Sequence, residues 1–155
     1  MSEPSAIGRI EVSAAPEILY ALVSDPGKLA EVAEEYSGHR WVGGAAAPVV
    51  GAKFRGRNRR GFRRWSTLST ITDADPGRRF GFEVTSAGLP VSRWQYDFEP
   101  DGDGCVVVES MWERRQAWFK VASSPVTGVW RRNEANTANI AATLARLKRV
   151  AEASR

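Results

Sequence analysis

Between residues 37 and 114 of this chain, apolar and polar residues alternate in six short runs separated by glycine, proline and aspartate. Alternation with a period of two is typical of strands with one buried face, and turns this short join antiparallel neighbours. The stretch therefore predicts a six-stranded antiparallel meander, which limits the possible folds more than any other feature. The expected strands cover residues 37–43, 51–58, 63–72, 78–85, 91–99 and 105–114.

The segment before the meander predicts one more strand and two short helices. Residues 6–13 alternate well enough for a first strand, which makes seven in all. Pro16 fits the first turn of a helix over residues 16–24. Asp25, a good N-cap residue that is followed by proline, then starts a second short helix over about residues 26–34.

The C-terminal segment from about Pro125 to Arg155 predicts a long helix, because side chains spaced by three and four residues form one stripe. The stripe contains Trp130, Asn133, Thr137, Ile140, Leu144, Leu147 and Ala151. Its second half is apolar, whereas Asn133 and Thr137 are unusual residues to bury unless a cavity or a polar group faces them. The second half is expected to seal the core and the first half to border a cavity. Residues 115–128 show no clear period, and no element is assigned to them.

One face of the predicted sheet is aromatic. Alternation places together Phe80, Phe82, Val84, Trp94, Tyr96 and Phe98. Such a face must be covered, and the terminal helix is the long amphipathic element left to cover it, so the sheet is expected to curve around that helix. Six to eight apolar helix side chains are too few to fill the space, which predicts a ligand cavity. The expected architecture is a single α+β domain over residues 1–155, in the order β-αα-β6-α.

Several phrases along the chain resemble one superfamily over about residues 7–152. They include APEILYALVSDPGKLAEV, VVGAKFRGRNRRG, STLSTITDADPGRRFGFEV, SRWQYDFEPDGDG and TLARLKRVAE. The superfamily is that of polyketide cyclases/dehydrases and lipid-transport proteins, also called SRPBCC. The resemblance implies the START-like helix-grip fold, in which a curved seven-stranded antiparallel sheet encloses a lipid, steroid or aromatic polyketide-like molecule. It implies no single reaction, because the superfamily mixes carriers, sensors and cyclases.

The side chains expected to bind the ligand are large aromatics with a few polar groups that could orient one or two ligand oxygens. They are Trp41, Phe54, Trp65, Thr67, Ser69, Phe82, Trp94, Tyr96, Trp112, Asn133 and Thr137. The leading hypothesis is binding of a small hydrophobic ligand in an internal cavity. The alternative is an enzyme of the polyketide cyclase or aromatase type.

No catalytic residue can be assigned from a motif, since the chain lacks GxSxG, HExxH and a glycine-rich phosphate loop. The remaining candidates for proton transfer are His39, Tyr96 and Glu109. His39 shares a strand face with Trp41, and it would be a pocket acid or base only if that face points inward. Otherwise it is a surface or structural histidine.

The strand over residues 105–114 offers two faces. One face carries Cys105, Glu109, Met111 and Glu113, and the other carries Val106, Val108, Ser110 and Trp112. The second face is expected to be the core, which leaves both glutamates in solvent. If the opposite face is inward, Glu109 becomes a buried carboxyl with a raised pKa and a suspected functional role.

Basic charge is concentrated in residues 55–64, RGRNRRGFRR, which contain six arginines, whereas the formal net charge of the chain is only +4. A local cluster of this kind is either a solvated turn or a docking site for RNA, the ribosome or anionic lipid. DNA is not expected as a partner.

The remaining features exclude several classes of site. One cysteine and one histidine do not supply a metal site, and no cofactor is expected. No apolar run approaches the roughly 20 residues of a membrane span, and the N-terminus lacks an apolar signal core, which predicts a cytoplasmic protein. An exposed sheet edge or the pair Trp118 and Phe119 could form a homodimer contact.

Overall fold

The computed structural model describes residues 3–25, 27–29, 36–44, 47–60, 62–115 and 132–153. Seven strands form one antiparallel sheet in the order β1-β7-β6-β5-β4-β3-β2, which confirms the predicted helix-grip architecture. The strands are β1 (Ala6–Val12), β2 (Tyr36–Val42), β3 (Lys53–Arg60), β4 (Arg63–Asp75), β5 (Arg79–Ser86), β6 (Leu89–Asp101) and β7 (Gly104–Glu113).

Beside the sheet, the described residues include the helices α1 (Pro16–Ser24) and α4 (Arg132–Ala153). The short helix expected over residues 26–34 lies largely outside the described residues, and so does the expected start of the terminal helix near Pro125. None of the described helices combines the length and apolar composition that a membrane span requires.

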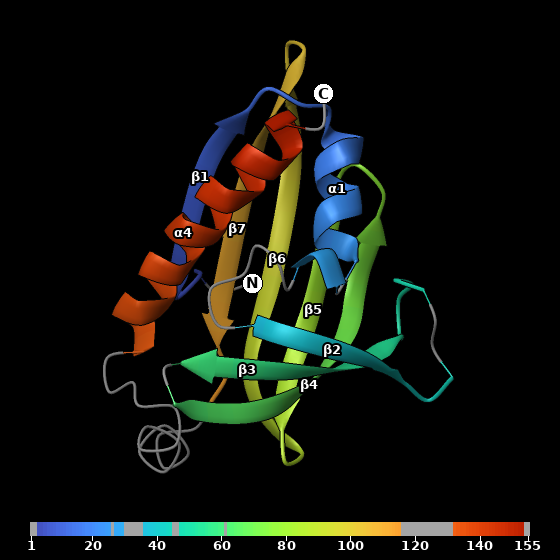
Figure 1. The fold of residues 1–155 in the computed structure, drawn as a ribbon, viewed down its shortest axis with the longest axis vertical. Coiled ribbons are helices and arrows are strands. Elements are labelled where there is room, and N and C mark those ends of the chain that lie inside the picture. Colours follow the sequence, from blue (N-terminus) through green and yellow to red (C-terminus); the bar gives the residue numbers. More distant parts are fainter. Residues whose placement is uncertain are drawn as a thin grey trace.

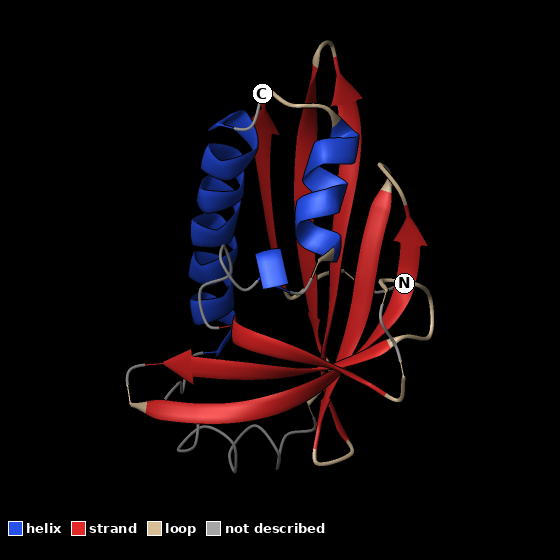
Figure 2. Ribbon diagram, turned by 45° about the vertical axis from the view of Figure 1, so that its right-hand side comes forward, coloured by secondary structure: helices blue, strands red, loops and turns tan. Residues whose placement is uncertain are grey.

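The sheet is strongly curved, and β2, β3 and β4 cross beneath the two helices (Figure 2). The pairing of β4 with β5 shifts register between Ile71 and Asp73, and the pairing of β5 with β6 shifts between Val84 and Thr85. Bulges of this kind bend a strand and increase its twist. The long strands β4 and β6 can therefore extend from the part of the sheet that the helices cover into the part that crosses beneath them.

Both helices lie on the concave side, where α4 runs along β1 and α1 stands over β5 and β6 (Figure 1). Helix α4 approaches β1 closely at Gly8. A Cβ atom at this position would lie 2.5 Å from Cγ2 of Ile140 and 3.1 Å from Cδ1 of Leu144. The missing side chain of Gly8 therefore sets how near the helix can lie to the sheet.

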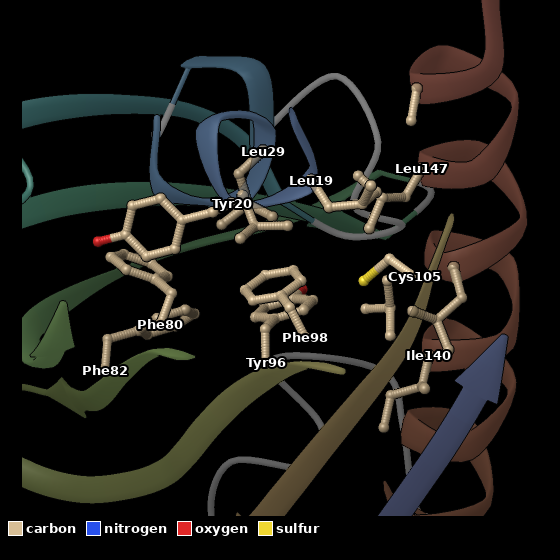
Figure 3. Close-up of a cluster of buried hydrophobic side chains, with 14 of the residues drawn as sticks. Leu19, Tyr20, Leu29, Phe80, Phe82, Tyr96, Phe98, Cys105, Ile140 and Leu147 are labelled. Atoms are coloured by element: carbon tan, nitrogen blue, oxygen red, sulfur yellow. The ribbon is translucent and has the colours of Figure 1, made fainter. Parts of the chain in front are cut away.

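The hydrophobic core joins both helices to the aromatic face of the sheet (Figure 3). The ring of Tyr20 on α1 meets Phe80 and Phe98 edge to face, with centroids 6.0 and 6.1 Å apart. From α4, the apolar half of the predicted stripe is fully buried, namely Ile140, Leu144, Leu147 and Ala151. The sealing role expected for the second half of this helix is confirmed.

Gly8→Ala should lower the free energy of unfolding by about 1–3 kcal/mol, because the added methyl group overpacks the contact with Ile140. Chemical denaturation of the purified variant measures this loss. Ile7→Ala is the matched control, since the neighbouring Ile7 side chain is 56% exposed. Equal stability of Gly8→Ala and wild type would contradict the close packing of α4 on β1.

Candidate functional site

The concave face of the sheet carries a continuous band of aromatic rings. Trp41 on β2 meets Phe54 on β3 with centroids 5.8 Å apart, and Phe54 meets Phe82 on β5 at 6.0 Å. Phe82 in turn lies 5.9 Å from Phe80. Trp94 on β6 pairs in register with Phe82 and packs against the same core. The expected aromatic inner face is therefore present, and it extends over four strands.

A carboxyl group lies in the middle of this apolar face. Glu109 on β7 is the register partner of Tyr96 on β6, and the Tyr96 hydroxyl donates a hydrogen bond of 2.8 Å to Glu109 Oε2. Each residue is only 2% exposed. The second carboxyl oxygen, Oε1, is buried and has no hydrogen-bond partner within the described part of the chain. A buried polar atom without a partner is costly and rare in native proteins, and it marks a place where another group can bind.

Burial controls the charge of this pair. It raises the pKa of the Glu109 carboxyl from 4.5 to about 8, although the hydrogen bond from Tyr96 acts in the opposite direction. Burial, reinforced by the neighbouring carboxyl, raises the pKa of the Tyr96 phenol well above its usual value of 10.0. At neutral pH the pair is therefore mostly uncharged, with one carboxyl proton and one phenol proton.

The position of Glu109 corrects the expected faces of β7. Cys105, Val107 and Met111 belong to the core on the concave side, so Glu109 points inward rather than into solvent. Trp112 lies on the convex face beneath the Arg93 guanidinium, 5.9 Å from its ring centroid, and cannot line the concave face. The expectation was wrong because β7 is a central strand that is buried on both faces, which removes the contrast on which alternation relies.

Two further pairs of polar groups on the concave face are joined by hydrogen bonds. The Asn58 side-chain amide donates to the Thr67 hydroxyl at 3.1 Å, and the Trp94 indole N–H donates to Ser92 Oγ at 2.9 Å. Ser69 is buried opposite Phe54, while Trp65 is half-buried opposite Asn58. The predicted ligand-binding residues on β3, β4 and β6 thus share one face.

A buried ion pair that the sequence did not suggest lies at the end of β7. The guanidinium of Arg115 donates from Nε to Glu113 Oε1 at 2.6 Å, and both side chains are less than a tenth exposed. Glu113 pairs in register with Ser92, which places it on the concave side. It was expected in solvent together with Glu109, and the same misassigned face explains this error.

Helix α4 presents different polar residues from those expected. Thr137 is exposed, whereas its neighbour Asn136 is 4% exposed and Thr143 is buried as well. Adjacent helix positions differ by about 100°, so at the start of α4 the inward stripe passes through Asn136 and not Thr137, whereas from Ile140 onward it follows the expected positions. The spacing of Asn136, Ile140 and Thr143 fits a helical stripe equally well and was the available signal. The side chains of His39 and Asn133 lie outside the described residues.

On the outer surface, a groove of about 770 Å³ is lined largely by charged residues. Three of its four carboxylates have basic partners: Asp97 accepts from Arg79 at 2.7 Å, Asp75 lies 3.7 Å from Arg78, and Asp73 binds Arg93 at 2.6 Å. This charged lining is a poor match for a hydrophobic ligand. Among the described residues, no three His, Cys, Asp or Glu side chains are grouped so that they could hold a metal ion.

Stability should fall as pH rises from about 4.5 to about 8. The folded state keeps the Glu109 proton over this range while the unfolded chain loses it, so the stabilisation present below pH 4.5 is lost by pH 8. The loss should be on the order of 4 kcal/mol. Urea unfolding of wild type and Glu109→Gln across this range measures it, and the variant should lack this part of the pH slope. Glu99→Gln, at an exposed position, is the control. Parallel pH profiles for wild type and Glu109→Gln would contradict the raised pKa.

Comparison with solved structures finds the same fold repeatedly. A Polyketide_cyc-like protein from Corynebacterium glutamicum is 29% identical, with a TM-score of 0.65 over 99% of this chain and 95% of that chain. A protein from Thermus thermophilus is 17% identical, with a TM-score of 0.71 over 96% of this chain and 97% of that one.

A third similar structure is the di-domain ARO/CYC StfQ from the steffimycin biosynthetic pathway. It is 15% identical, with a TM-score of 0.71 over 96% of this chain and 50% of that chain. No curated protein sequence matches the chain significantly. The family described as "Polyketide cyclase / dehydrase and lipid transport" matches residues 5–152. The chain therefore belongs to the polyketide cyclase/dehydrase and lipid-transport family.

Proposed function

We propose that this protein binds a small hydrophobic ligand in an internal cavity between the concave face of the sheet and α4. The observation that carries the proposal is the buried Tyr96 and Glu109 pair, in which the carboxyl oxygen Oε1 has no hydrogen-bond partner among the described residues and lies on a largely aromatic face. An apolar wall with a few fixed polar groups is the usual design of a small-molecule site. The family description, which includes lipid transport, supports the same role.

The state of Glu109 indicates which polar group the ligand carries. Tyr96 donates to Oε2, so the proton of an uncharged Glu109 carboxyl is available at the partnerless Oε1. That O–H group can donate to a ligand carbonyl or hydroxyl oxygen. A ligand carboxylate would instead bring a negative charge into an apolar space beside an acid that is itself difficult to ionise. The favoured ligand is therefore a neutral lipid, steroid or aromatic polyketide-like molecule with a keto or hydroxyl group.

A long-chain alcohol should raise the melting temperature more than a fatty acid of equal chain length. Native mass spectrometry should show one bound molecule per chain. Tyr96→Phe should weaken binding about 3- to 10-fold, because the variant loses the hydrogen bond that orients the Glu109 carboxyl. Titration of the ligand followed by tryptophan fluorescence measures the affinity.

A matched pair of tryptophans separates the concave site from the convex face. Trp94→Phe changes the concave wall and should lower the affinity for the same ligand. Trp112→Phe changes the convex face and should leave this affinity unchanged. The proposal fails if no neutral lipid, sterol or aromatic polyketide-like compound stabilises the protein. It also fails if the two tryptophan variants weaken binding equally.

A second candidate function is an enzyme of the polyketide cyclase or aromatase type. It is favoured by the same pair, since Glu109 and Tyr96 both hold dissociable protons at neutral pH in an apolar setting. Ring closure by attack of a carbanion on a ketone, followed by loss of water, requires a proton to be delivered to oxygen. An acid whose pKa is about 8 is protonated at neutral pH and can still release its proton.

For this enzymatic role, Glu109→Gln should reduce kcat on a poly-β-ketone model substrate by about 100-fold or more, with little change in KM. The wild-type rate should fall as pH rises past about 8, where Glu109 loses its proton. Glu83→Gln, at a half-exposed position on the outer face, is the control and should leave kcat unchanged. Turnover by Glu109→Gln at the wild-type rate would remove Glu109 from the mechanism, and absence of turnover by the wild-type protein would leave it a binding protein only.

A further inference from the structure

The charge of this chain is divided between two regions. Residues 36–72 contain no Asp or Glu but eight cationic residues, namely Arg40, Lys53, Arg55, Arg57, Arg59, Arg60, Arg63 and Arg64. Eight of the 22 lysines and arginines thus lie in this segment, so the rest of the chain has 14 of them against all 18 acidic residues. The net charge of +4 hides a strongly basic segment and an otherwise acidic protein.

The strand register gathers these cations on one surface. Phe54 belongs to the core, so the alternate positions of β3 from Lys53 to Arg59 point to the outer, convex side. Arg40 on β2 is the register partner of Arg55, and Arg59 is the register partner of Arg64 on β4. All six side chains are exposed. We call this surface the basic face; it comprises Arg40, Lys53, Arg55, Arg57, Arg59 and Arg64.

Like charges at these positions repel one another. Directly paired residues have Cβ atoms about 5 Å apart, and alternate residues of one strand are about 7 Å apart. Both spacings are shorter than the screening length of about 8 Å at physiological salt. The nearest outer acidic residues in the register, Asp73 on β4 and Glu83 on β5, face Arg93 instead, at 2.6 and 3.9 Å. A dense layer of negative charge outside the protein would relieve this repulsion.

The turn between β3 and β4 indicates what kind of anion fits. Phe62 lies in this turn and is 81% exposed, the largest exposure among the large hydrophobic side chains described. The outward residues of β4 beside the arginines are Ser66, Leu68 and Thr70, so among the described residues Phe62 is the single aromatic ring at this surface, whereas single-stranded nucleic acid stacks successive bases on several rings. A bilayer with anionic headgroups accepts both features, because it binds cations at its surface and an aromatic ring at the boundary with the acyl chains.

We propose that the basic face docks the protein onto an anionic membrane surface, with Phe62 inserted at the level of the headgroups. The strands β2, β3 and β4 lie below both helices, so this contact leaves α1 and α4 away from the membrane (Figure 2). The acidic remainder of the chain favours the same orientation, because the bilayer repels it. The contact does not use the concave site, so it stands independently of the proposed ligand.

Co-sedimentation with vesicles of phosphatidylcholine, with and without phosphatidylglycerol, tests this docking. The protein should bind only the anionic vesicles, and high salt should release it. Arg55→Gln combined with Arg59→Gln should weaken binding about 25-fold, since each neutralised arginine at the surface contributes about a 5-fold factor. Phe62→Ser should weaken binding without changing its salt dependence.

Arg114→Gln combined with Arg149→Gln is the matched control, because it removes the same charge from exposed positions outside the basic face. Thermal unfolding checks that each variant is folded. If a variant does not fold, the salt titration of the wild-type protein still tests the proposal. Equal weakening by both double variants would overturn the proposal, and so would absence of binding to anionic vesicles at low salt. Tighter binding to a single-stranded RNA than to the vesicles at the same salt would also overturn it.

Discussion

The aromatic concave face of the sheet must be kept from water, and the rest of the structure depends on this constraint. Bulges in β4 and β6 accompany the curvature of the sheet, and α1 and α4 cover its concave side. The missing side chain of Gly8 lets α4 approach β1 closely enough for Ile140 and Leu144 to pack there. Burial of these rings is the main favourable term in folding, and it also creates the apolar surroundings of the candidate site.

Those surroundings decide the chemistry of the interior. A carboxyl group placed among aromatic rings keeps its proton at neutral pH, so Glu109 behaves as a hydrogen-bonding acid and not as an anion. Its bond with Tyr96 satisfies one oxygen and leaves the other for a further partner. On the opposite side of the same strands, Arg93 and Asp73 form an ion pair of 2.6 Å over the convex surface. The sheet thus separates an uncharged polar site from a charged exterior.

Most of the fold could be predicted because local signals agreed with one another. Period-two alternation and turn residues indicated the strands, and the apolar half of α4 was correctly assigned to the core. The faces of β7 were assigned wrongly, although a better signal was present. Gly102 and Asp103 form a two-residue turn between the paired residues Asp101 and Gly104, and counting back from it places Glu109 opposite Tyr96. For deciding which face of a central strand points inward, the register of its hairpin is more reliable than alternation, because both faces of such a strand are buried.

The sequence by itself determined the order of elements, the family, the aromatic inner face and the concentration of basic charge between β2 and β4. Only the tertiary structure decided which polar groups are buried. It placed Glu109 inside, Trp112 outside, and Asn136 rather than Thr137 toward the interior. Local patterns record the period of an element but not its rotation against its neighbours. That rotation is fixed by packing between segments far apart in the chain, and it determines which side chains lose water and acquire altered chemistry.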